Sequence, residues 1–183
     1  MEHLRRSLMS CSDIDRSLHR IALEILERNH GGDGVGIIGI HTGGVYLADR
    51  LTRILQEREN ITIPVGSLDI TLYRDDWSLI AQNPIVKKTD ITFSVENRTI
   101  ILVDDVIFTG RTIRAALDAI MDFGRPRFIQ LVALIDRGGR ELPIQPDYVG
   151  MQVSVGANEH VHVLLEEDSE CDEVVIISRG NPR

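Results

Sequence analysis

The sequence is poor in cysteine, has a deficit of positive charge and contains no long apolar run. Cys11 and Cys171 are too few for a disulfide framework, so we expect a reducing, cytoplasmic setting. No apolar stretch approaches the ~18 residues of a membrane span, which predicts no membrane association. The net charge of −8 is unlike that of a dedicated nucleic-acid binder, which is usually basic. Any contact with RNA would therefore need a local basic patch.

Apolar periodicity predicts an α/β fold in a single domain, residues 1–183, because no repeat, linker or low-complexity segment divides the chain. Asp13 is a plausible N-cap for the first helix. Pro64 suggests an edge or an irregular start for the second strand. We expect helices at 13–29, 45–57 and 113–121, and strands at 35–40, 61–70, 99–103, 128–135, 160–165 and 174–177.

The most informative stretch runs from Thr99 to Leu117. Residues 99–103 are apolar or β-branched without polar alternation, which is typical of a parallel strand buried on both faces. Two adjacent carboxylates, Asp104 and Asp105, follow the strand. A short loop then leads into an amphipathic helix that Gly124 and Pro126 terminate.

This order of strand, acids, loop and helix favours a ribose 5-phosphate site. A helix N-terminus suits a phosphate, and Gly110 allows a close backbone approach. Ionised carboxylates accept hydrogen bonds only, so Asp104 and Asp105 should face sugar hydroxyls. An ordinary nucleotide-binding or receiver-like junction remains the alternative. The expected contacts of the loop are Val106, Ile107, Phe108, Thr109, Gly110, Arg111 and Thr112.

Two further strand ends carry candidate residues. The strand at 35–40 leads to Thr42, Gly43 and Gly44, and the strand at 128–135 leads to Asp136 and Arg137. Ligands of open α/β sheets bind at the carboxyl ends of the strands. We therefore expect these segments and the Asp104–Thr112 stretch to converge on one site.

The stretch Val103–Thr112 is similar to the phosphoribosyl-diphosphate (PRPP) motif of type I phosphoribosyltransferases. Residues 68–76, 101–113 and 136–144 resemble the PyrR family most specifically. The resemblance implies the type I phosphoribosyltransferase fold, a central mostly parallel sheet flanked by helices, with a flexible loop at about 72–90 and a hood at about 137–160. It also implies a uracil phosphoribosyltransferase, which converts uracil and PRPP to UMP and pyrophosphate.

The same resemblance implies roles for individual residues. Thr42, Gly43 and Gly44 would hold pyrophosphate, and Arg74 would act beside Asp104 and Asp105 in catalysis. Arg137 would lie at the nucleotide and Val161 at the base. Mg²⁺ would bind through the substrate without a direct protein ligand. Gly43 departs from the family, which has arginine there, so the level of activity is in question, and on sequence alone Gly43→Arg should raise turnover.

A regulatory role is also implied, in which the protein responds to UMP by binding the leader mRNA of a pyrimidine operon. Arg16, Arg20, Arg28 and Arg140 are the candidate RNA-binding residues, although a solvated basic face is the simpler explanation of the helical arginines. The rival hypothesis is a catalytically weak RNA-binding regulator that uses the PRPP/UMP pocket only as a sensor. The PyrR-like segments argue against a purine enzyme. The resemblance also implies a homodimer or a higher homo-oligomer.

Overall fold

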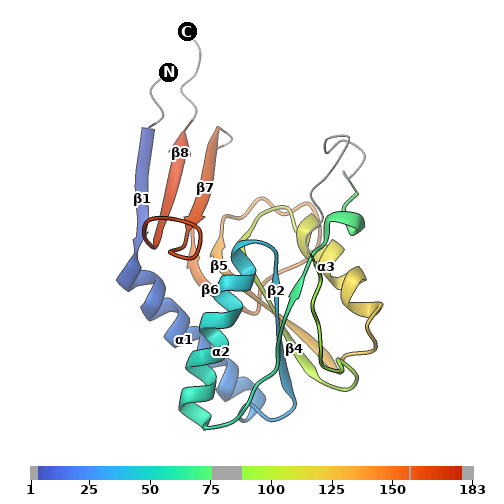
Figure 1. Ribbon diagram of the computed structural model, residues 1–183. Helices are drawn as coiled ribbons and strands as arrows, with labels where there is room; N and C mark the ends of the chain where they lie inside the picture. The colour runs from blue at the N-terminus through green and yellow to red at the C-terminus, as the bar shows by residue number, and fades with distance from the viewer. Residues whose placement is uncertain (1–3, 76–87, 157, 179–183) are drawn as a thin grey trace.

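The computed structural model describes residues 4–75, 88–156 and 158–178 of the chain (Figure 1). The elements follow one another as β1 (Leu4–Ser10), α1 (Cys11–Asn29), β2 (Val35–Ile40), α2 (Gly43–Glu59), β3 (Val65–Leu68), η1 (Thr71–Tyr73), β4 (Thr99–Ile107), α3 (Arg111–Met121), β5 (Phe128–Asp136), β6 (Tyr148–Gln152), β7 (Glu159–Leu164) and β8 (Glu173–Ser178).

A five-stranded parallel sheet in the order β3-β2-β4-β5-β6 forms the centre of the molecule. The six residues of β2 are all buried, as expected for a strand covered on both faces. One apolar core contains side chains of α1 and α2, and a second core contains those of α3. The helices therefore cover both faces of the sheet, and the predicted α/β fold is confirmed (Figure 1).

The first helix begins earlier than predicted. Ser10 is its N-cap, and Asp13 is the third helical residue of a capping box: Ser10 N donates to Asp13 Oδ2 at 2.9 Å, and Asp13 N donates to Ser10 Oγ at 3.4 Å. The N-cap assigned to Asp13 was therefore wrong by three positions. The apolar stripe itself is buried as predicted, and its members are Ile14, Leu18, Ile21, Ala22, Ile25 and Leu26.

A separate three-stranded antiparallel sheet, in the order β1-β8-β7, joins the two ends of the described chain (Figure 1). Met9 and Val174 from this sheet share the apolar core of α1 and α2, so the small sheet packs on the large one. Strand β6, which lies within the segment predicted as a hood (137–160), pairs with β5 in the large sheet. Residues 159 and 160 alone from that range belong to the small sheet.

Other boundaries also shift. The predicted strand at 61–70 is reduced to β3, and β4 continues beyond the expected end at Val103 to Ile107. The flexible loop predicted at 72–90 falls mostly outside the described residues. Its described start is η1, and Asp90 forms an isolated antiparallel bridge with Ser67. None of the described helices has the length and apolarity that crossing a membrane requires.

Candidate active site

The junction of β4 and α3 encloses a cavity of about 300 Å³ at the carboxyl end of the sheet. Gly110 precedes α3 with a φ of 91°, a left-handed conformation that glycine adopts without strain. The loop is braced from the other side, since Glu141 N and Leu142 N donate to Thr109 O at 3.0 and 3.1 Å. The cavity is lined by Arg74, Asp75, Asp104, Val106, Ile107, Phe108, Thr109, Gly110, Arg111, Thr112 and Ile113.

The two central acids lie on β4 itself and not beyond it. Asp104 is buried, and its Oδ1 accepts a hydrogen bond from Asp105 N at 3.0 Å. Asp105 is half-buried, and its Oδ1 accepts from Val106 N at 2.8 Å. Burial raises the pKa of Asp104 well above its usual value, and the charge of Asp105 raises it further; burial also raises the pKa of Asp105. A site that holds two carboxylates at this cost is a candidate for electrostatic catalysis.

The carboxylates of Asp104 and Asp105 have different surroundings. Asp104 contributes to the wall of the cavity, whereas Asp105 leans over the first turn of α2. A Cβ atom built on Gly43 would lie 2.5 Å from Asp105 Oδ2 and 2.9 Å from Asp105 Cγ. Asp105 therefore uses the space that any side chain at position 43 would need.

The β2–α2 junction is close-packed. A Cβ on Gly44 would lie 2.3 Å from Val103 O, and one on Gly39 would lie 2.5 Å from Gly44 O. Thr42 is exposed and is the N-cap of α2, with no side-chain capping hydrogen bond. The predicted pyrophosphate loop thus lies directly beside the end of β4, as expected from the parallel pairing of β2 with β4.

Arg137, at the end of β5, places its guanidinium 4.0 Å from the centroid of the Phe108 ring. Arg137 Nη2 donates to Glu159 O at 3.3 Å, which links the large sheet to β7. Its buried Nε has no hydrogen-bond partner among the described residues. Val161 is half-buried on β7 and packs against the apolar core that contains α1 and α2.

The cation at the mouth of the cavity has two acidic partners that the sequence analysis missed. Arg111 Nη1 lies 2.6 Å from Asp75 Oδ2, and Arg111 Nε lies 2.6 Å from Glu141 Oε2. A pairing between residues 36 positions apart has no local signal in the sequence.

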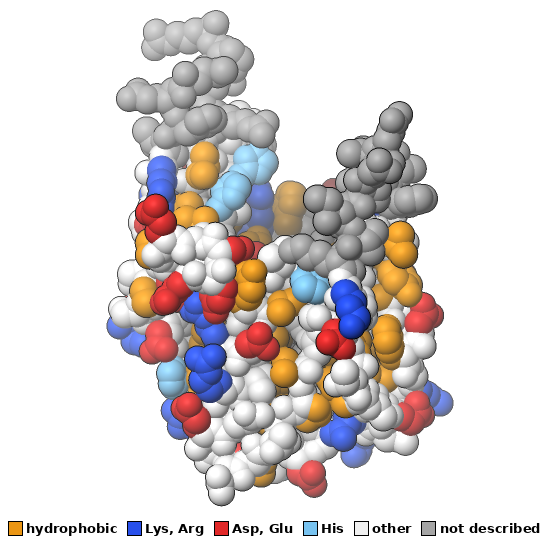
Figure 2. Space-filling view, in the orientation of Figure 1, with side chains coloured by type: hydrophobic (Ala, Val, Ile, Leu, Met, Phe, Trp, Pro, Cys, Tyr) orange, Lys and Arg blue, Asp and Glu red, His pale blue; other side chains and the backbone are white. Residues whose placement is uncertain are grey.

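The four arginines proposed for RNA divide into two kinds. Arg140 is nearly buried, with 12% of its side chain exposed, and binds Asp136 and the carbonyl oxygens of Phe108 and Ile144. The three arginines of α1 have between 46% and 69% of their side chains exposed but also have acidic partners, which are Asp13 for Arg16, Glu24 for Arg20 and Asp147 for Arg28. Charges of both signs are interspersed over the face that Figure 2 shows.

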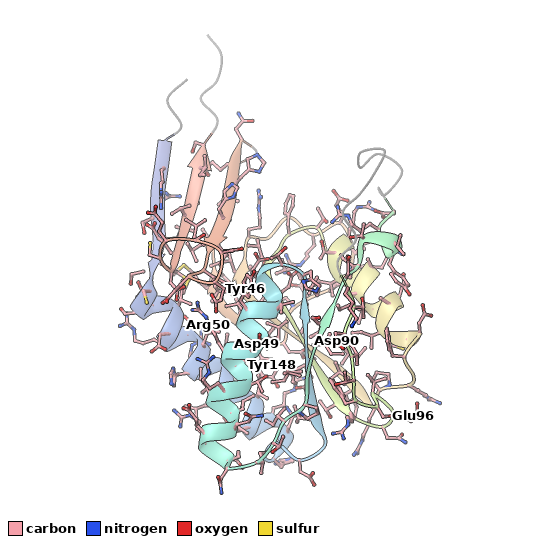
Figure 3. The ribbon with its side chains drawn as sticks, in the orientation of Figure 1. Tyr46, Asp49, Arg50, Asp90, Glu96 and Tyr148 are labelled. Carbon is pink, nitrogen blue, oxygen red and sulfur yellow. The ribbon has the colours of Figure 1, made fainter. Side chains whose placement is uncertain are left out.

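In the part of the chain that the structure describes, one group of three residues has ligand atoms close enough to hold a metal ion: Cys11, Glu166 and Asp172. This group lies away from the β4–α3 cavity. Arg50 of α2, which Figure 3 labels, lies 2.5 Å from Asp172 and 2.6 Å from Glu167, so its guanidinium already neutralises negative charge at this group. We therefore describe it as a structural ion-pair cluster that fastens the β7–β8 loop to α2.

Comparison with known proteins identifies the class. Residues 11–170 match the family model of the phosphoribosyl transferase domain. In solved structures, a hypoxanthine phosphoribosyltransferase from Trypanosoma cruzi superposes with a TM-score of 0.73 at 19% identity and 95% coverage of both chains. The chain has the fold of the phosphoribosyltransferases, as predicted.

Curated relatives narrow this class to one family. The protein named Bifunctional protein PyrR from Syntrophobacter fumaroxidans is 48% identical over 183 residues, which is 100% of this chain and 98% of the relative. The namesake from Geobacter sulfurreducens is 53% identical over 169 residues, covering 92% of this chain and 96% of the relative. The chain therefore belongs to the PyrR family, and the resemblance seen in the sequence is confirmed.

Proposed function

We propose that the protein transfers a ribose 5-phosphate group from PRPP to uracil, giving UMP and pyrophosphate. The observation that carries this proposal is the cavity at the β4–α3 junction, which combines a helix N-terminus with the buried carboxylate of Asp104. Backbone N–H groups and threonine hydroxyls at residues 109–112 suit a phosphate. Asp104 suits the hydroxyls of the attached ribose.

The chain's own residues would act by position and charge. As pyrophosphate leaves, positive charge develops at the C1 carbon of the ribose. Carboxylates held in a site from which water is largely excluded stabilise that charge more than they would in bulk water. Asp104 and Asp105 supply this negative charge. The uracil ring nitrogen attacks C1 directly, so no protein nucleophile is needed. Mg²⁺ enters as part of the PRPP substrate, bound through its oxygens and water.

Arg137 and Val161 are the proposed contacts of the nucleotide and base. The buried Nε of Arg137, which lacks a partner among the described residues, offers a donor to a bound ligand. Arg74 lines the phosphate cavity and is the proposed cationic contact for pyrophosphate. Thr42, Gly43 and Gly44 would hold pyrophosphate through the backbone at the start of α2.

The test is a comparison of nucleobases. Purified protein with PRPP and Mg²⁺ should release pyrophosphate with uracil, and should release far less with hypoxanthine or guanine. Activity with a purine above that with uracil would contradict the proposal. A protein that releases no pyrophosphate with any base, but still binds UMP, would support the sensor hypothesis.

A second, regulatory role is favoured by the name of the relatives, which describes them as bifunctional. We propose that α1 contributes to binding of pyrimidine-operon leader mRNA. Arg16 and Arg28 keep 69% and 52% of their side chains exposed despite their acidic partners. Arg20 is less available, because its Nη2 donates to the carbonyl oxygens of Val149 and Gly150. Arg140 is the weakest candidate, because it is mostly enclosed by its own loop.

Titration of a leader RNA with and without UMP tests this role. RNA binding should tighten when UMP is present. Arg16→Ala should weaken RNA binding to a similar extent for different RNA sequences, and it should reduce the salt dependence of the affinity. Arg125→Ala, on the exposed segment between α3 and β5, is the matched control. Light scattering on the same samples tests the proposed homodimer or higher oligomer. RNA binding that is unaffected by both UMP and Arg16→Ala would contradict the proposal.

A further inference from the structure

The phosphate cavity has an acidic residue in its wall that comes from a distant part of the chain. Asp75 lies just beyond η1 and lines the same cavity as Thr109 and Thr112. Its Oδ2 is 2.6 Å from Nη1 of Arg111, the first residue of α3. A carboxylate in this position repels an entering phosphate and occupies the cation at the helix N-terminus.

Glu141, the second carboxylate that pairs with Arg111, is held in a different way. Glu141 belongs to the segment whose backbone N–H groups bind Thr109 O, so it is fixed to the cradle itself. Glu141 is absent from the cavity wall, whereas Asp75 is part of it. Of the two ion pairs, the one between Asp75 and Arg111 therefore lies in the path of the ligand.

The short helix η1, which precedes Asp75 in the chain, is anchored to α3. Arg114 Nη2 donates to Tyr73 O at 3.0 Å, and Tyr73 OH donates to Asp122 Oδ2 at 2.5 Å. These contacts hold η1 beside the helix and keep Asp75 close to Arg111. The ion pair is half-exposed, with 43% of the Asp75 side chain and 49% of the Arg111 side chain accessible, so it can exchange partners at small cost.

We propose that Asp75 is an internal competitor of the ligand's phosphate, and that a phosphorylated ligand binds by exchanging the Asp75–Arg111 ion pair for a phosphate–Arg111 pair. Arg111 keeps Glu141 in both states. The exchange makes affinity depend on the phosphate, because a ligand without one cannot displace Asp75. The inference rests on the proposed function, since it takes the cavity to be the 5-phosphate site.

Calorimetric titration with UMP and with uridine tests the exchange. Asp75→Asn removes the competing charge and keeps the shape of the side chain, so it should tighten UMP binding by about three- to fivefold. Uridine binding should not change. The matched control is Asp33→Asn, which removes an exposed acid on the loop between α1 and β2, outside the cavity wall, and should leave the affinity for UMP as in the wild type.

Two results would overturn the inference. UMP binding to Asp75→Asn that is weaker than or equal to the wild type would show that Asp75 supports the site or is indifferent to it. An equal gain for uridine would show that the effect does not pass through the phosphate. A wild type that binds neither UMP nor PRPP would instead contradict the assignment of this cavity as the 5-phosphate site, on which the inference rests.

Discussion

Two strand-to-helix junctions of this protein share one sequence plan but differ in packing. After β4, residues 108–110 form a loop that leaves a cavity of about 300 Å³ beside the start of α3. After β2, two residues (41 and 42) precede α2, and Gly43 and Gly44 approach β4 so closely that neither has room for a Cβ. The same pattern of strand, glycine and helix thus gives an open cradle in one case and a tight backbone contact in the other.

The difference shows what the glycines do at each place. Gly110 provides a left-handed turn that aims the N-terminus of α3 at the cavity. Gly44 allows α2 to approach the carbonyl oxygen of Val103 more closely than a residue with a Cβ could. Asp105 lies between the two junctions, and its position depends on the absence of a side chain at Gly43.

The largest expected effect is on the chemistry of the open junction. Asp104→Asn and Asp105→Asn should each lower kcat by about 10²- to 10³-fold, because each removes charge that stabilises the developing cation. Pyrophosphate release measures the rate. Circular dichroism should show an unchanged fold, since asparagine keeps the side-chain oxygen that accepts the neighbouring backbone N–H. Wild-type rates from both variants would remove these residues from the mechanism.

The tight junction should be the more sensitive of the two to an added methyl group. Gly44→Ala places a Cβ against backbone atoms of β4, so it should lower the free energy of unfolding by about 1–3 kcal/mol. Gly110→Ala meets its nearest atoms at 3.5 Å, so its cost is confined to the left-handed backbone, about 1–2 kcal/mol. Urea unfolding of both variants ranks them, and a greater loss for Gly110→Ala would contradict the comparison.

At position 43 the structure reverses the expectation from the sequence. Gly43→Arg restores the cation of the family pattern, but its Cβ displaces Asp105, so turnover should fall by about tenfold, or ~1.4 kcal/mol. Gly43→Ala separates the two effects, because it displaces Asp105 and adds no charge. If Gly43→Arg exceeded the wild-type rate, the gain from the cation would outweigh the displacement of Asp105.

The smallest predicted effect is on the pH dependence of stability. The pKa of Asp104 is raised by burial and by the charge of Asp105, so the native state binds this proton more tightly than the unfolded chain does. The resulting stabilisation is present below the unfolded pKa of about 3.9 and is lost as the pH rises through the folded value. Asp104→Asn should therefore be more stable than the wild type at neutral pH.

Thermal unfolding across the acid range measures this effect. The advantage of Asp104→Asn should shrink as the pH approaches the unfolded value, because the wild-type carboxyl is then protonated as well. Asp118→Asn, which removes an exposed carboxylate of α3, is the control for the substitution itself. A variant less stable than the wild type at neutral pH would contradict the cause given for the pKa shift.

Local sequence signals were sufficient for the elements that form the site. The unbroken apolar run of β4, the stripe of α3 and the glycines at both junctions predicted the central sheet and the convergence of its strand ends, which the pairing of β2, β4 and β5 confirms. The family resemblance added functional roles for individual residues, which apolar periodicity cannot predict. The end of β4 was less predictable, because two acids in a buried strand contradict the usual rule that charge marks a strand's end.

Strands β7 and β8 were predicted at 160–165 and 174–177, whereas β1 and β6 escaped prediction for a physical reason. Strand β1 begins Leu4-Arg5-Arg6-Ser7, which has no apolar alternation, and it is a strand because it pairs with β8 at the other end of the chain. Strand β6 is five residues long and contains Gly150, so its place beside β5 is decided by tertiary contacts. The ion pair of Asp75 with Arg111 is likewise a consequence of the fold.

The pairing of β1 with β8 also constrains how the molecule is made. Leu4 is opposite Ser178, so the first strand leaves the ribosome long before its partner has been translated. Strand β7 pairs with the other edge of β8, so both strands wait for the same six residues. The small sheet can therefore assemble only after Ser178 has emerged, whereas the parallel sheet has all five of its strands once Gln152 has emerged.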